Sequence, residues 1–148
     1  MYTTFCVDWL NELITKHEFS TEIPTLLLWE GVTNYISQEV VESTLEKCSS
    51  NFTTAPCLIA FDYSSPKLIE EMGPKMKALG ESWVFGMESN DMVNLLTEKK
   101  LQVLEHISLN DGKHRYFPKR KTDGKFVTVG SDTPFLLVAG NSNCHYSK

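Results

Sequence analysis

The sequence predicts an α/β fold in which a mainly parallel sheet finishes in antiparallel strands. Apolar runs at residues 26–29 and 56–61 are typical of central parallel strands, which helices cover on both faces. Segments with helical spacing of apolar residues precede and follow these runs. Three short segments at residues 101–109, 125–130 and 134–140 have the composition of closing strands, the last two joined by a turn around 130–134.

The first helix is expected over residues 7–17 and a second over 38–48. Ser37 is a plausible N-cap for the second helix. Apolar residues at helical spacing would face the core: Val7, Leu10, Leu13 and Ile14 in the first helix, and Val41, Leu45 and Cys48 in the second.

A third helix is expected to begin at Ser65 as N-cap with Pro66 at its first position. Its apolar face would consist of Leu68, Ile69, Met72 and Met76. Gly73 and Pro74 should kink or divide it. A short amphipathic helix capped by Ser89 follows, and the basic segment 112–125 is expected to be a solvated loop rather than a nucleic-acid patch.

Length and charge restrict the function. The 148 residues are the size of one ordinary domain, and neither a repeat nor a domain boundary interrupts residues 1–148. The chain has 14 basic and 19 acidic residues and a net charge of −5, which argues against broad binding to nucleic acid or anionic membranes. No signal-peptide pattern or membrane-length apolar run is present, so we expect a cytoplasmic protein.

Two carboxylates end the two apolar strands. Glu30 follows residues 26–29, and Asp62 stands near the end of the run that begins at Pro56. Ligands of open α/β sheets bind beyond the carboxyl ends of the strands, so both side chains are candidates for a binding site. The residues alone also allow Glu30 to cap a helix or pair with a lysine, and Gly31 to serve only as a turn.

The segments PTLLLWEGVTNYIS, APCLIAFDY and TPFLLVAG together resemble the leucine carboxyl methyltransferase family, over nearly the whole chain. The resemblance implies part of a Rossmann-like class I methyltransferase fold and S-adenosylmethionine (SAM) as the cofactor. The implied reaction is O-methylation, with a carboxylate as the expected acceptor, either on a small molecule or at a protein C-terminus. Such an acceptor is already ionised at neutral pH and needs no dedicated base.

The resemblance also implies roles for particular residues. Glu30 would contact the cofactor, whose ammonium, hydroxyl and amine groups are donors to a carboxylate. Gly31 would let the backbone pass close to the cofactor, and Asp8 corresponds to a second cofactor contact. Asp62 and Tyr63 would border the substrate pocket, although Tyr63 has an equal claim to pack beneath the following helix.

The chain departs from the family pattern before its first strand. No glycine precedes Gly31, so the Gly-rich cofactor loop is missing and the chain corresponds to the C-terminal half of the family's domain. The alternative is a non-catalytic α/β remnant that binds a protein partner or only folds. Without the other half, the strand at residues 26–29 would have an open edge through which the chain could self-associate.

Cysteine and histidine residues do not predict a further site. Cys6, Cys48, Cys57 and Cys144 are scattered without metal-ligand spacing, so no metal is expected. The four histidines have no evident Ser or Cys partner. We assign them to the surface or to strand ends rather than to catalysis.

Overall fold

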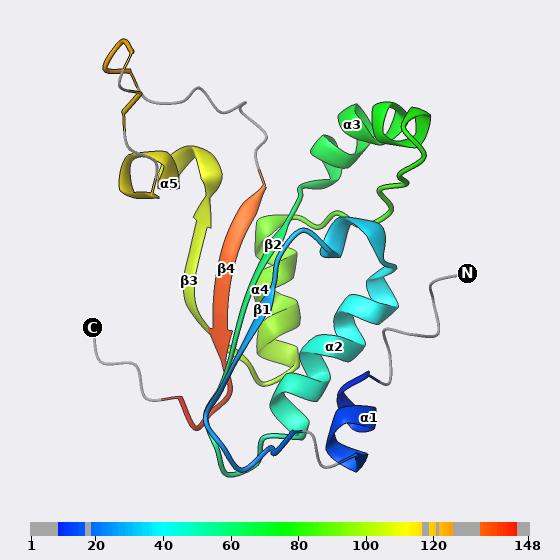
Figure 1. The fold of residues 1–148 in the computed structure, drawn as a ribbon, viewed down its shortest axis with the longest axis vertical. Coiled ribbons are helices and arrows are strands. Elements are labelled where there is room, and N and C mark those ends of the chain that lie inside the picture. The colour runs from blue at the N-terminus through cyan, green and yellow to red at the C-terminus, as the bar shows by residue number, and fades with distance from the viewer. Residues whose placement is uncertain (1–8, 17–18, 117–118, 121, 126–133, 145–148) are drawn as a thin grey trace.

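The computed structural model describes residues 9–16, 19–116, 119–120, 122–125 and 134–144, with the exception of the Trp9 and His114 side chains. In chain order the elements are α1 (Trp9–Thr15), β1 (Thr25–Trp29), the 3-10 helix η1 (Thr33–Tyr35), α2 (Gln38–Ser50), β2 (Cys57–Tyr63), α3 (Pro66–Ala78), α4 (Ser89–Glu98), β3 (Gln102–Ser108), α5 (Leu109–Tyr116) and β4 (Phe135–Gly140). The α/β fold class is confirmed (Figure 1).

The four described strands form one sheet in the order β1-β2-β4-β3. β1 pairs with β2 in parallel, with Trp29 opposite Phe61, and α2 makes the crossover between them. β4 is antiparallel to both β2 and β3, so the sheet has the expected parallel start and antiparallel finish. The strand expected at residues 125–130 and the turn after it lie, except for Lys125 and Pro134, outside the described residues.

The core occupies one side of the sheet. In β2 the residues that face this side are buried, and the alternate residues are only half-buried. The predicted inner face of α2, formed by Val41, Leu45 and Cys48, is buried against the sheet, as are Met92 and Leu96 of α4. α1, α2 and α4 all lie on this side of the sheet in Figure 1. The inner face predicted for α2 is therefore confirmed.

The opposite side of β1 is open, contrary to the expectation that helices cover both faces. Leu26 and Leu28 project from this side and are 64% and 71% exposed. Leu27 and Trp29, which point the other way, pack against the core cluster. Leu27 and Trp29 are apolar because they face the core. Leu26 and Leu28 are also apolar, but none of the residues that the structure describes covers their side of the strand.

α3 is continuous rather than divided at Gly73 and Pro74. It runs from Pro66 to Ala78 through Pro74, and it begins as expected, with the Ser65 hydroxyl accepting a 3.2 Å hydrogen bond from the Leu68 N–H. None of its residues is buried. An interior proline removes one backbone hydrogen bond, and in a solvent-exposed helix water can satisfy the carbonyl that is left over.

Three smaller predictions need correction. Helix α5 occupies part of the segment expected to be a loop, because Ser108 caps it by accepting a 3.0 Å hydrogen bond from the Asp111 N–H. Glu88 occupies the N-cap position of α4, one residue before the predicted Ser89, and its side chain makes no capping hydrogen bond. His106 lies within β3 and is half-buried, not at the surface. Among the helices described, none has both the length and the apolar character needed to cross a membrane.

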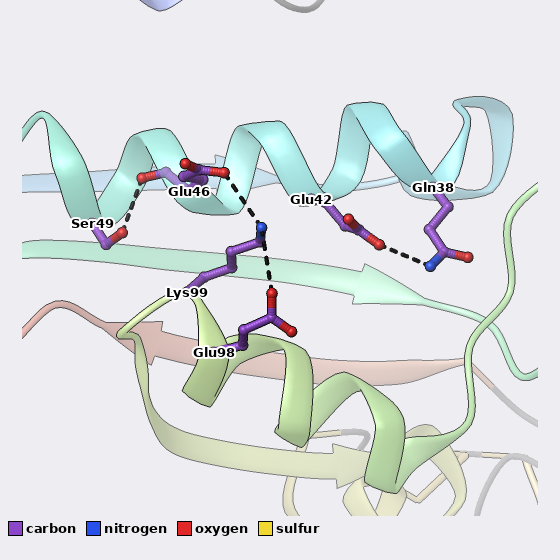
Figure 2. A network of polar contacts seen from close by, with 6 residues as sticks. All are labelled: Gln38, Glu42, Glu46, Ser49, Glu98 and Lys99. Atoms are coloured by element: carbon purple, nitrogen blue, oxygen red, sulfur yellow. Dashed lines mark hydrogen bonds and ion pairs between the residues drawn. The ribbon is translucent and has the colours of Figure 1, made fainter.

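Lys99 joins the end of α4 to α2 (Figure 2). Its ammonium lies 3.3 Å from the Glu46 carboxylate and 3.9 Å from that of Glu98. Both carboxylates are largely exposed, so water screens the attraction. Burial of α2 and α4 against the sheet therefore contributes far more to their stability than these exposed contacts.

Candidate functional site

Glu30 and Asp62 lie side by side at one edge of the sheet. β1 and β2 are parallel and in register, with Trp29 opposite Phe61, so the residues that follow this pair project from the same edge. Both carboxylates line one groove. The structure thus brings together, at the carboxyl ends of two parallel strands, the two acids that the sequence singled out.

A backbone hydrogen bond fixes the turn after β1. The Gly31 N–H donates to the Asp62 carboxylate across 2.6 Å, and the hydroxyl of buried Thr33 donates to the Asp62 carbonyl, also across 2.6 Å. Gly31 has a φ of +69°, which other residues adopt only with strain. The carboxylate of Asp62 is therefore already engaged in holding the turn that carries Glu30.

The Glu30 side chain is differently placed. It is exposed, and it makes no hydrogen bond or ion pair with the residues that the structure describes. It neither caps a helix nor pairs with a lysine in this part of the chain, the two structural roles that the sequence left open. A carboxylate held at a strand end without a protein partner is available to accept hydrogen bonds from a ligand.

We use the name sheet groove for the depression beside Glu30 on the open side of the sheet. It has a volume of about 310 Å³. Its lining comprises Leu28, Glu30, Ala60, Phe61, Asp62, Glu105, Ile107, Leu109, Tyr116, Leu136, Leu137 and Val138. This volume is near the lower limit of ligand pockets, roughly 300 Å³. The described residues therefore offer one wall of a binding site rather than an enclosed cavity.

Tyr63 does not join Asp62 in the sheet groove. Its side chain is fully buried on the opposite, helix-covered side of the sheet. The ring stacks on Phe135 at 5.1 Å, and the hydroxyl lies 2.7 Å from His106 Nε2. Burial raises the pKa of the Tyr63 hydroxyl and lowers the pKa of His106, so both groups are neutral near pH 7.

The Tyr63–His106 pair is a polar feature that sequence reasoning missed. Its only signal in the sequence was strand alternation. His106 lies opposite Leu137 of β4, so the two side chains point to the same, core-facing side of the sheet. Two further polar atoms near this end of the sheet, Asn34 Oδ1 and Ser64 Oγ, are buried without a hydrogen-bond partner among the described residues. Such atoms are uncommon in folded proteins.

Other candidates are not placed by the structure. Asp8, the second expected cofactor contact, lies outside the described residues. In the described ranges, no group of three His, Cys, Asp or Glu side chains is arranged to hold a metal ion.

Comparison with known proteins identifies similar folds at low sequence identity. No protein-family model matches the chain, and no curated protein matches it. A DUF574 family protein from Streptomyces avermitilis has a similar backbone, with a TM-score of 0.58 and 13% identity over 93% of this chain and 52% of that chain. A structure of LepI in complex with SAM is more distant, with a TM-score of 0.43 and 9% identity over 84% of this chain and 29% of LepI.

The low sequence identities limit what these comparisons show about this chain. At 13% identity, the similarity to the DUF574 protein shows a common fold only. The chain spans about half the length of that protein. The similarity to LepI is too low to indicate more about this chain.

Proposed function

We propose that this chain is the C-terminal part of a SAM-dependent O-methyltransferase domain and that Glu30 binds the cofactor. The observation that carries the proposal is the exposed Glu30 carboxylate, which stands without a protein partner among the described residues at the carboxyl end of β1. The resemblance of the PTLLLWEGVTNYIS segment to the leucine carboxyl methyltransferase family supports the same residue.

The described residues fit one edge of the cofactor. Glu30 would accept hydrogen bonds from cofactor hydroxyl or amino groups, and the turn at Gly31 holds this carboxylate in place through its hydrogen bond to Asp62. The remaining contacts would come from polypeptide outside the described chain, because no glycine precedes Gly31 and the sheet groove is small.

When bound, the cofactor supplies an electrophilic methyl group on a sulfonium. Transfer of this methyl group to an acceptor oxygen is the chemistry that the cofactor would supply, and it would leave S-adenosylhomocysteine. For an ionised carboxylate acceptor, no side chain has to remove a proton, so this chain contributes by positioning. Asp62 would position Glu30 through its hydrogen bond to the Gly31 N–H. Tyr63 would contribute a buried, uncharged side chain that packs under the strand ends.

The free thiols agree with a cytoplasmic location. Among the described residues, Cys48, Cys57 and Cys144 are all unbridged. Disulfides are rare in the reducing cytosol and common in secreted domains of this size.

The experiment is a titration of S-adenosylhomocysteine into the ¹⁵N-labelled chain, followed by NMR at millimolar ligand. Perturbation should centre on the amides of Glu30 and Gly31. Glu30→Gln should weaken binding by roughly tenfold or more, as expected for loss of a charge-assisted hydrogen bond. Glu22→Gln is the matched control, because Glu22 is exposed and precedes the opposite end of β1.

The alternative is a non-catalytic α/β fragment. It is favoured by one observation, that the chain spans about half the length of the DUF574 protein whose fold it shares. Absence of any perturbation at Glu30 and Gly31 at millimolar ligand would reject cofactor binding by the chain and favour this alternative. Equal weakening by Glu30→Gln and Glu22→Gln would reject the role of Glu30.

A further inference from the structure

Among the described residues, no strand lies beside the outer edge of β1. β1 is hydrogen-bonded to β2 on one side, and in the described sheet it is the terminal strand. An edge strand presents backbone N–H and C=O groups that can pair with another strand. Edges are commonly protected by charge or proline, but β1 consists of Thr25, Leu26, Leu27, Leu28 and Trp29.

An apolar surface continues from this edge across the sheet. The outward residues of three neighbouring strands are Leu26, Leu28, Leu58, Ala60, Leu136 and Val138, and their register puts them in adjacent rows. α1, α2 and α4 cover the other side of the sheet, as Figure 1 shows. Parallel strands of α/β proteins are ordinarily covered on both faces, and no helix in the described part of the chain lies across this surface.

The shape of the surface favours a helix as its cover. The sheet groove is concave, and Leu109 and Tyr116 of α5 form one of its walls. A convex apolar helix fits such a groove, as in many complexes where a helix binds a hydrophobic cleft. The flat open face of a second copy fits less well, because the wall formed by α5 would stand between the two sheets.

We propose that the open edge of β1 and the sheet groove together bind an α/β polypeptide, which adds a strand to β1 and lays an apolar helix in the groove. The DUF574 protein, which shares this fold, has about as much polypeptide outside the matched region as within it, because the match covers 52% of that chain. The inference depends on the fold and does not require that the chain bind SAM.

The test is a cysteine footprint. Leu28→Cys places a thiol in the groove, and Leu79→Cys is the control, because Leu79 is 76% exposed beyond the end of α3. Maleimide labelling at each position is quantified by mass spectrometry. The labelling is measured for the chain alone and for the chain joined to the polypeptide encoded immediately upstream of the Met1 codon. Amide hydrogen exchange of β1 is recorded in parallel.

We expect both cysteines to react rapidly in the chain alone. In the joined protein, labelling of Leu28→Cys should slow at least tenfold and the amides of β1 should gain protection, while labelling of Leu79→Cys is unchanged. Equal labelling of Leu28→Cys in the two proteins would overturn the proposal. Labelling is carried out at submicromolar concentration, below the range of weak self-association. Protection of Leu28→Cys in the chain alone under these conditions, together with the mass of two copies, would overturn the proposal in favour of a stable homodimer.

Discussion

The Gly31 N–H and the Asp62 carboxylate are joined by a 2.6 Å hydrogen bond that links the ends of two parallel strands. This contact keeps Glu30 at the edge of the sheet groove. The bond connects residues 31 positions apart in the sequence, so it forms only when β1 and β2 are paired. The candidate site is thereby coupled to the sheet itself.

Asp62→Ala should destabilise the fold by about 1 kcal/mol, because it leaves the Gly31 N–H without its acceptor. Asp62→Asn retains a side-chain oxygen and should lose less than half of that amount. Urea unfolding monitored by circular dichroism measures the difference. Equal losses in the two variants would show that the negative charge, rather than the hydrogen bond to Gly31, is what matters.

Gly31→Ala should cost about 1 kcal/mol of stability, because its φ of +69° lies in the left-handed region. A Cβ at this position would meet no atom within 4 Å, so the whole cost arises from the backbone. Gly73→Ala is the contrasting variant: Gly73 lies inside α3 and also has open space around it, and alanine there should stabilise the helix by roughly 0.5–1 kcal/mol. Thermal unfolding of both variants gives the comparison, and a neutral Gly31→Ala would contradict the prediction.

The sequence predicted those parts of the site that depend on strand ends. Apolar runs located β1 and β2, and parallel pairing then required Glu30 and Asp62 to share an edge. The sequence could not show that the Asp62 carboxylate binds a backbone N–H, because this contact depends on the left-handed turn at Gly31. It also gave no indication of which face of β1 would remain open.

The missed helix α5 has a local explanation. The basic composition of residues 112–125 suggested a solvated loop, yet the start of the helix is specified just before that segment by Ser108 and Asp111. Ser108 followed three residues later by an acid is a recognisable capping signal. The Tyr63–His106 contact is different in kind, since no local pattern predicts which residues meet across β2, β4 and β3.

The stability of the fold should fall as the pH is lowered from about 7.5, roughly one unit above the ordinary histidine pKa of about 6.5, because of His106. Burial lowers the pKa of His106 below the value near 6.5 expected in the unfolded chain. The unfolded state therefore binds a proton first as the pH falls, and the free energy of unfolding decreases through the folded pKa. His106→Gln should show a shallower decrease in urea unfolding measured at several pH values. Parallel curves for the two proteins would assign the pH dependence to other groups.

In the absence of a covering polypeptide, the chain should self-associate through its open sheet face at roughly 10–100 µM. Leu26 and Leu28 are 64% and 71% exposed beside an unpaired strand edge, so association removes apolar surface from water and satisfies backbone groups. Leu28→Lys introduces a charge at this edge and should shift the chain towards monomer without unfolding it, because residue 28 is not part of the core. Leu79→Lys introduces the same charge at a similarly exposed leucine away from the sheet and should leave association unchanged. Sedimentation velocity over this concentration range gives the masses. A wild-type chain that stays monomeric throughout, or an equal effect of the two lysine variants, would rule out the open face as the contact.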